Sequence, residues 1–261
     1  MTVLPYYEVH EGAGAPLLMV HGILSSRAQW QPNIETLKRV CSPVVVELFG
    51  HGRSPSPRDS YPYHPDGYIE AFEEIRRRLG VDHWFVCGYS LGAGLTIRYS
   101  LDNANVVAAQ IFTNSTSAFA DRSDAAYRQN ADEVLLRFEE GGIEAIDAIP
   151  VPPKLAQRLP PDVKSALLED CQLLDPAGVA RTIAYTNGNS SVRDVLGRNT
   201  VPALLICGKH ESRFQPLREH VSSNMPNLDI IDLPAGHAVN AEDPEGFNNA
   251  VMDFLARYRG S

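Results

Sequence analysis

Gly-Tyr-Ser-Leu-Gly at residues 88–92 is the stretch that decides the fold. It matches the pattern G-x-S-x-G, in which a sharp turn between a strand and a helix exposes the serine hydroxyl at the end of a sheet. Both flanking glycines are needed because the turn is crowded and a Cβ there would collide with neighbouring backbone. The pattern predicts that Ser90 is a nucleophile, and the alternative is a glycine-rich turn whose serine has no chemical role.

The residues on both sides of this pentapeptide have the patterns that such a turn requires. Before it, residues 83–87 read His-Trp-Phe-Val-Cys, an apolar and β-prone run typical of a buried strand. After it, residues 91–99 carry apolar side chains at helical spacing. The order strand, turn and helix favours the nucleophile over the structural turn.

Length and composition describe an ordinary globular chain. Its 261 residues, 44% hydrophobic and 21% charged, suffice for one large α/β domain or for a core domain with an insertion. The formal net charge of −9 argues against a nucleic-acid or an anionic-membrane partner. A small-molecule substrate is the partner that we expect, and the sequence leaves open whether the protein is a monomer or a homo-oligomer.

Cysteine usage and hydropathy restrict the class further. The four cysteines, at positions 41, 87, 171 and 207, share no C-x-x-C spacing, so no metal or redox motif is predicted. Residues 1–19 lack a basic region followed by an apolar stretch, and no apolar run reaches the roughly 18–20 residues that span a bilayer. We therefore expect a reduced, cytoplasmic protein.

Strand-like runs alternate with helical patterns along most of the chain. Six apolar, β-prone runs are predicted as strands, at residues 17–20, 43–48, 84–87, 107–112, 203–207 and 228–233. Helical spacing lies between them, for example at 67–79 and 216–224. This alternation predicts a mostly parallel central sheet flanked by helices on both faces.

The alternation stops between residues 118 and 196, where no strand-like run occurs. Helical spacing is found at 124–140, 142–149 and 162–174, and proline clusters at 150–153 and 160–161 separate these stretches. We expect residues 1–117 and 197–261 to form the core domain and residues 118–196 to form a helical cap over the serine.

A serine nucleophile needs a base, and the base needs a group that orients it. The predicted base is His237, in a glycine-containing loop after the strand-like run 228–233. The predicted acid is Glu211, which follows the run 203–207 at the carboxyl end of a strand, where open α/β sheets place their sites. Asp232 is a rival acid, but it lies inside a strand pattern and only five positions before the histidine.

Two backbone N–H groups are predicted to stabilise the oxyanion that forms when the serine attacks a carbonyl. One belongs to Leu91, directly after the serine at the start of its helix. The other belongs to Ile23, in the loop after the strand-like run 17–20. In the neighbouring loops, His21 and His51 are expected to shape the backbone rather than to act as catalysts.

Together these motifs resemble the α/β-hydrolase superfamily from about Leu17 to the C-terminus. The matching segments are His21-Gly22, Gly50-His51-Gly52-Arg53-Ser54, Gly88–Gly92, Gly208–Glu211 and Gly236-His237. The resemblance implies the α/β-hydrolase fold, a mostly parallel sheet flanked by helices with a helical cap insertion. The order nucleophile, acid, base along the chain is also characteristic of that superfamily.

Within the superfamily, some segments are similar to the menaquinone-pathway synthase that forms 2-succinyl-6-hydroxycyclohexadiene carboxylate. They are residues 21–26 with 30–32, residues 88–92, and Glu-Ser-Arg-Phe at 211–214, which is similar to that family's Asp-x-Lys-Phe. The sequence departs from the synthase at two points. Gly94 stands where the synthase usually carries an arginine that holds a substrate carboxylate, and the acid is a glutamate instead of an aspartate.

The predicted function is hydrolysis of an ester-like bond (carboxylic ester, lactone or thioester) in a small organic substrate through an acyl-enzyme. This chemistry needs no metal and no organic cofactor. One alternative is a C–C bond hydrolase or a synthase-like lyase that uses the same triad. An alternative of another class is a ligand-binding or receptor-like protein with little turnover.

Several residues are candidates for the substrate pocket. Tyr89, beside the nucleophile, is expected either to line the pocket or to pack in the core. The small residues Gly92, Ala93 and Gly94 are expected to leave room next to the serine for a bulky group. Arg213, Arg122 and Arg128 could each bind a carboxylate, with an ordinary surface position as the alternative for each of them.

Overall fold

The computed structural model describes residues 2–123, 130–147, 149 and 153–258. Its centre is a seven-stranded sheet in the order β1-β3-β2-β4-β5-β6-β7. β1 is antiparallel to β3, and all other neighbouring strands are parallel. The strands are β1 (Tyr7–Val9), β2 (Pro16–Val20), β3 (Ser42–Val46), β4 (Trp84–Gly88), β5 (Val107–Thr113), β6 (Ala203–Gly208) and β7 (Leu228–Leu233).

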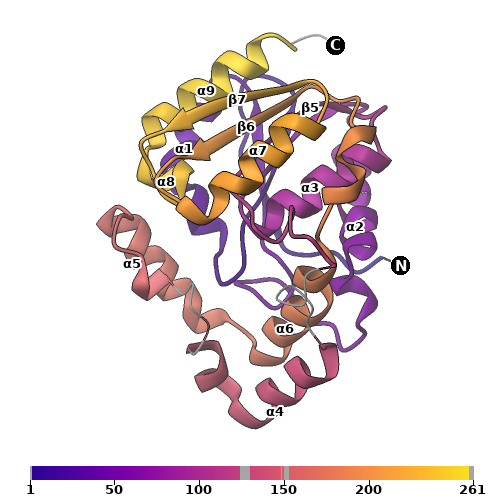
Figure 1. Cartoon of the computed structure of the whole chain (residues 1–261), viewed down its shortest axis with the longest axis vertical. Helices are drawn as coiled ribbons and strands as arrows, with labels where there is room; N and C mark the ends of the chain where they lie inside the picture. Colours follow the sequence, from indigo (N-terminus) through magenta and orange to yellow (C-terminus); the bar gives the residue numbers. More distant parts are fainter. Residues whose placement is uncertain (1, 124–129, 148, 150–152, 259–261) are drawn as a thin grey trace.

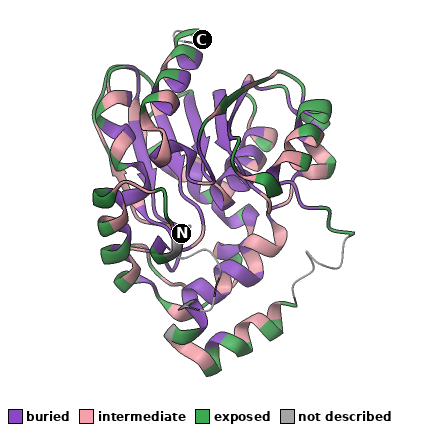
Figure 2. Cartoon of the chain, turned by 60° about the vertical axis from the view of Figure 1, so that its left-hand side comes forward, coloured by how far each residue is buried: buried purple, intermediate pink, exposed green. Residues whose placement is uncertain are grey.

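Helices cover both faces of this sheet (Figure 1). Alternate side chains of a strand point to opposite faces, and in β2 Leu17 belongs to one buried apolar cluster and Leu18 to another. Because both faces are covered, the central strands are buried (Figure 2) and read as continuous apolar runs. One face packs against α1 (Gln31–Leu37) and α9 (Pro244–Ala256), and the other against α2 (Pro65–Leu79), α3 (Leu91–Asp102) and α7 (Gln215–Asn224).

All six strands predicted from the sequence are present, as β2 to β7, with bounds that agree within two residues. The sequence did not predict β1. This strand has only three residues, and none of them is buried, so it shows no apolar run. Its position is set by backbone pairing with β3.

Segment 118–196 is helical in its described parts. Its longer helices are α4 (Ala131–Asp147), α5 (Pro161–Asp170) and α6 (Pro176–Arg181), which gather at one end of the molecule (Figure 1). Gly142, with φ 51° and ψ −126°, interrupts α4 with a kink. The helices expected at 124–140 and 142–149 therefore correspond to the two halves of α4. Residues 124–129, among them Arg128, lie outside the described residues.

The end of segment 118–196 is fastened to loops of the core. The hydroxyl of Thr182 donates to the carbonyl oxygen of Phe49 at 3.1 Å, and that of Thr186 donates to the carbonyl oxygen of Tyr63 at 2.6 Å. Val179, within α6, is fully buried. The chain after α5 therefore packs as part of the core surface.

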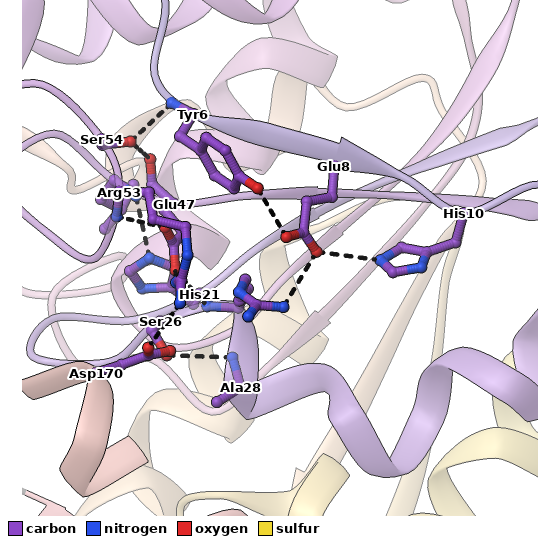
Figure 3. A network of polar contacts seen from close by, with 12 residues as sticks. Tyr6, Glu8, His10, His21, Ser26, Ala28, Glu47, Arg53, Ser54 and Asp170 are labelled. Atoms are coloured by element: carbon purple, nitrogen blue, oxygen red, sulfur yellow. Dashed lines mark hydrogen bonds and ion pairs between the residues drawn. The ribbon is translucent and has the colours of Figure 1, made fainter. Parts of the chain in front are cut away.

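An ion-pair network ties α5 to the core as well (Figure 3). Arg53 lies between two carboxylates, 3.1 Å from Glu47 and 3.2 Å from Asp170 of α5. The hydroxyl of Ser26 donates to the other oxygen of Asp170 at 2.6 Å. The side chain of Glu47 is fully buried, and burial raises the pKa of its carboxyl. The network joins α5 to the loop that carries Ile23, three residues before Ser26.

Three features that would indicate other classes of protein, namely a membrane-spanning helix, a metal-binding cluster and a disulfide, are absent from the described part of the chain. There, no helix combines the length and apolarity needed to cross a bilayer. Within the same residues, no three or more His, Cys, Asp or Glu side chains are grouped so that they could hold a metal ion. The four cysteines, all of them described, form no disulfide.

Candidate active site

The turn at residues 88–92 leads from β4 directly into α3. Ser90 has φ 54° and ψ −118°, a conformation that a non-glycine residue adopts only under constraint. The constraint is crowding. A Cβ on Gly92 would lie 2.2 Å from the carbonyl oxygen of Val20, and one on Gly88 would lie 2.5 Å from the backbone of α3. Glycine at both positions lets α3 approach the sheet while the turn exposes the serine.

Ser90, His237 and Glu211 form a continuous chain of hydrogen bonds. His237 Nε2 lies 2.9 Å from Ser90 Oγ, and His237 Nδ1 lies 2.9 Å from Glu211 Oε1. The three residues follow β4, β7 and β6, whose parallel order brings their carboxyl ends to one edge of the sheet. With Nδ1–H donating to the carboxylate, Nε2 is left to accept the serine proton, as a general base must.

Asn114, which the sequence did not predict, holds the second oxygen of the acid. Its side-chain amide donates to Glu211 Oε2 at 2.6 Å, and it also exchanges hydrogen bonds with the backbone of Gly208. Asn114 is fully buried directly after β5. Burial alone would raise the pKa of Glu211, but the hydrogen bonds from His237 and Asn114 outweigh burial and hold this pKa below its ordinary value. The carboxylate is therefore ionised at neutral pH.

The rival acid Asp232 has a different partner. Its carboxylate receives two hydrogen bonds from the guanidinium of Arg218, at 2.7 and 2.9 Å, on an exposed part of β7. The structure thus brings Glu211 to His237 and pairs Asp232 elsewhere.

Glu242, which the sequence also did not predict, fastens the loop of the histidine. It ends the short helix α8 (Val239–Glu242). Its Oε2 accepts the N–H of Gly236 at 2.7 Å, and its Oε1 accepts the N–H of Ala238 at 3.2 Å. One carboxylate therefore holds the backbone on both sides of His237.

The two residues predicted as oxyanion donors border the serine. Leu91 is the first residue of α3, so its N–H has no acceptor within the helix. Ile23 follows Gly22, whose added Cβ would lie 2.8 Å from the Cβ of Ser90 and 3.2 Å from its Oγ. The loop after β2 thus passes directly against the serine, and both Leu91 and Ile23 line the cavity described below.

Two buried histidines shape that loop. His21 donates through Nδ1 to the carbonyl of the next residue at 2.6 Å and accepts the N–H of Leu48 at Nε2 at 3.0 Å. His51 accepts the N–H of Leu24 at 3.1 Å and donates to the carbonyl two residues before it at 3.0 Å. Burial lowers the pKa of His21 to about 3 and that of His51 to about 4. Both imidazoles are neutral structural links.

Acidification is expected to destabilise the fold through these two histidines. In the unfolded chain each has an ordinary pKa near 6.5, so below that pH the unfolded chain binds protons that the folded protein does not. The stabilisation is complete above pH 6.5, and each histidine removes roughly 1.4 kcal/mol per pH unit from the free energy of unfolding between about pH 6 and pH 4.5. Urea unfolding over this range measures the slope.

A matched pair of variants tests whether the buried histidines cause this pH dependence of the free energy of unfolding. We expect His51→Asn to reduce the pH dependence by about half, and the same change at the exposed His83 to leave it unchanged. A free energy of unfolding that does not fall between neutral pH and about pH 5 would contradict the neutral, buried state of both imidazoles.

A cavity of about 880 Å³ lies over the serine. From the core it is lined by Ser90, His237, Glu211, Leu91 and Ile23. From segment 118–196 it is lined mainly by apolar residues, namely Ile149, Pro153, Ala156, Leu159, Leu167 and Ile183. A volume of this size is typical of a site for a small organic molecule.

Two of the candidate pocket residues line this cavity, Tyr89 and Arg213. Gly94 does not, and the free space expected beside it is absent. A Cβ on Gly94 would lie 2.7 Å from the carbonyl oxygen of Ser190 and 3.4 Å from the side chain of Ala118. The prediction of room for a bulky group was wrong, because segment 118–196 packs against α3 at this point.

Arg122 is also not among the cavity residues. Burial and the neighbouring charge of Arg98 lower its pKa, and Asp194 opposes this shift. The structure places Arg122 outside this cavity at an exposed position, which agrees with the alternative of an ordinary surface arginine.

Comparison with known proteins agrees with the geometry of the fold. The model of the alpha/beta hydrolase fold family matches residues 15–244. A Bacillus subtilis (strain 168) protein assigned as a 2-succinyl-6-hydroxy-2,4-cyclohexadiene-1-carboxylate synthase is 26% identical over 262 residues, covering 96% of this chain and 94% of that protein. Carboxylesterase YbfK of the same organism is 25% identical over 244 residues, covering 92% and 79%. MenH from S. aureus superposes with a TM-score of 0.81 at 18% identity, covering 97% and 98%, which shows a common fold.

Proposed function

Since the chain belongs to the alpha/beta hydrolase fold family, we propose that it hydrolyses an ester-like bond (carboxylic ester, lactone or thioester) of a small organic substrate through an acyl-enzyme. The observation that carries the proposal is the hydrogen-bonded chain from Glu211 through His237 to Ser90, which opens on a cavity of about 880 Å³. The similarity to a carboxylesterase supports it.

In the proposed reaction, His237 Nε2 takes the proton of Ser90 as the serine oxygen attacks the substrate carbonyl. Glu211 holds the imidazole tautomer and stabilises the imidazolium that forms. The N–H groups of Leu91 and Ile23 bind the oxyanion. His237 then gives the proton to the leaving oxygen or sulfur, and a water deprotonated by the same imidazole releases the acid and restores the serine hydroxyl.

Segment 118–196 is proposed as the cap of this site, with residues 1–117 and 197–261 as the core domain. Its apolar residues line the cavity opposite the serine, so they contact whatever part of the substrate lies away from the scissile bond. The link from Arg53 to Asp170 holds α5 to the core. In this arrangement the segment sets specificity and the core supplies the chemistry.

A lyase reaction like that of the synthase is the second candidate, because the 26% identical Bacillus subtilis relative carries that assignment. Gly94 lies four residues after the serine, where the resemblance to the synthase implies an arginine. The carbonyl of Ser190 leaves no room for a longer side chain at that position. This difference favours ester hydrolysis over the lyase reaction.

Covalent labelling tests the proposal directly. A fluorophosphonate probe should label the protein stoichiometrically, and mass spectrometry should place the adduct on Ser90. Ser90→Ala should stay unlabelled, whereas Ser117→Ala, which changes another serine of the same cavity, should label normally. Failure both to label and to hydrolyse p-nitrophenyl esters of graded acyl length would overturn the proposal and favour a ligand-binding protein. Labelling without ester hydrolysis would favour the lyase.

The loop of His237 gives a kinetic prediction. Glu242→Gln should lower kcat about tenfold with KM little changed, because a small misalignment of the base affects proton transfer more than substrate binding. The amide retains one acceptor oxygen and turns its NH₂ towards the other backbone N–H, so one side of the loop is released. The measurement is steady-state kinetics with a p-nitrophenyl ester. Glu245→Gln, at an exposed position of α9, is the control, and an unchanged kcat for Glu242→Gln would contradict the role of this carboxylate.

A further inference from the structure

The charged side chains that line the cavity differ in whether they have partners. Its two carboxylates, Glu211 and Glu242, are both engaged by protein donors. Its three arginines are Arg137, Arg158 and Arg213. Within the described part of the chain, none of these arginines forms an ion pair with a carboxylate. The charge of Arg213 helps to lower the pKa of Glu211, but both carboxylates direct their oxygens to other donors. In the described part of the chain, the three guanidinium groups are therefore not bound by a carboxylate.

This imbalance does not come from a shortage of acids. The chain has 32 acidic and 23 basic residues, and several arginines elsewhere are paired with carboxylates. Arg53 lies 3.2 Å from an aspartate oxygen, Arg76 lies 2.6 Å from a glutamate oxygen and Arg218 lies 2.7 Å from an aspartate oxygen. Arginine pairs readily with carboxylates because its planar guanidinium can donate two parallel hydrogen bonds. Arginines that line the cavity without a carboxylate partner thus fit a ligand that brings the carboxylate.

Two of the three arginines are connected to the segment that carries Glu211, one by a side-chain contact and one by sequence. Arg158 Nη1 lies 2.9 Å from His210 Nδ1, and His210 directly precedes Glu211. Arg213 follows in the same loop, two residues after Glu211. We call Arg158, His210 and Arg213 the basic rim. All three are exposed to solvent at the cavity, so an anion can reach them without passing the apolar lining.

The basic rim offers several donors and no acceptor charge. Because His210 Nδ1 accepts from Arg158, its Nε2 carries the proton and is a further donor. Arg158 belongs to segment 118–196 and Arg213 to the loop after β6, so an anion between them would be held from both sides of the cavity. Arg137 is not part of the rim, because its guanidinium lies over the ring of Phe138, 5.1 Å from the centroid.

We propose that the basic rim binds a carboxylate of the substrate, so that the substrate class is an organic acid that carries the ester-like bond at a distance from its carboxylate. This inference rests on the proposed hydrolase function, because it takes the scissile carbonyl to lie at Ser90 between Leu91 and Ile23. The carboxylate can belong to the acyl part or to the leaving group. For a carboxylic ester, hydrolysis then yields a dicarboxylic acid in the first case and a hydroxy acid in the second.

Matched esters with and without a carboxylate test the inference, in two arms. The acyl arm compares the mono-p-nitrophenyl ester of glutaric acid with p-nitrophenyl pentanoate, and the leaving-group arm compares p-acetoxybenzoic acid with p-tolyl acetate. In at least one arm we expect kcat/KM to be about tenfold or more higher for the anionic ester, the size of effect that one charge-assisted contact provides. The arm that shows the preference identifies the part of the substrate that carries the charge.

Variants of the basic rim assign the preference to its residues. Arg158→Gln and Arg213→Gln should each reduce kcat/KM for the preferred anionic ester about tenfold more than for its neutral partner. Arg39→Gln, at an exposed position, should change neither. Normal hydrolysis of the neutral esters without a preference in either arm, or a preference that survives both rim variants, would overturn the anion site and leave the hydrolase proposal standing. Absence of hydrolysis of all four esters, with no fluorophosphonate label, would overturn the hydrolase proposal itself.

Discussion

Replacing Glu211 by glutamine should lower kcat about 10³–10⁴-fold while KM changes little. Asn114 donates to Glu211 Oε2, so the oxygen of the new amide will stay with Asn114 and its NH₂ will face His237 Nδ1. That nitrogen must then accept instead of donate, which moves the imidazole proton to Nε2. Ser90 would meet an N–H where it needs a base. Steady-state kinetics with the best p-nitrophenyl ester measure the loss.

The rival acid provides the matched control for this prediction. Asp232→Asn removes a carboxylate from the next strand but leaves the hydrogen bond between Glu211 and His237 intact, since Asp232 pairs with Arg218. Its kcat should equal that of the unchanged protein. More than a tenth of the activity remaining in a folded Glu211→Gln protein would show that Glu211 does not set the tautomer. Thermal unfolding of both variants establishes that they are folded.

The strands of the sheet could be predicted because each is a short apolar run covered by helices on both faces. β4 and β6 are buried along their whole length, so their side chains leave a continuous apolar signal in the sequence. β1 leaves none, because it is an edge strand that owes its position to backbone pairing with β3. A strand held by its backbone alone is not visible in a pattern of side chains.

The arrangement of the proposed catalytic residues could be predicted from topology and the nature of their loops. In a parallel sheet every strand delivers its carboxyl end to the same edge, so Ser90, Glu211 and His237 had to lie close to one another once their strands were placed. Asn114 and Glu242 could not be predicted in this way. Their roles depend on which backbone and side-chain groups they meet, and an isolated amide or carboxylate in a loop has no distinctive spacing.

Gly94 shows a different limit of prediction from sequence. A run of small residues in a helix indicates close approach by something, but it does not say whether that is substrate or protein. Here it is protein, because the carbonyl of Ser190 occupies the position beside Gly94. The contact joins parts of the chain that are far apart in sequence, and no local pattern reports it.

Gly22→Ala is the second change with a large expected effect, about 10²–10³-fold in kcat, the loss that follows removal of one oxyanion donor. The added Cβ would lie 2.8 Å from Ser90 Cβ and 3.1 Å from the ring of Tyr89. Neither neighbour can retreat, since Ser90 is held in its turn and Tyr89 is buried. The loop must therefore move, and the N–H of Ile23 moves with it.

Thermal unfolding shows whether Gly22→Ala is folded, and for the folded protein the labelling rate reports on the oxyanion donors. Fluorophosphonate labelling of Gly22→Ala should slow along with turnover, because the developing phosphonyl oxyanion would need the same two donors, whereas the spacing of Ser90 and His237 is unaltered. Gly197→Ala is the control, since the nearest atom to its Cβ would be 3.9 Å away, and its kinetics should be unchanged. A folded Gly22→Ala protein with full activity would mean that the Ile23 N–H does not bind the oxyanion, and the second donor would have to come from elsewhere in the loop after β2.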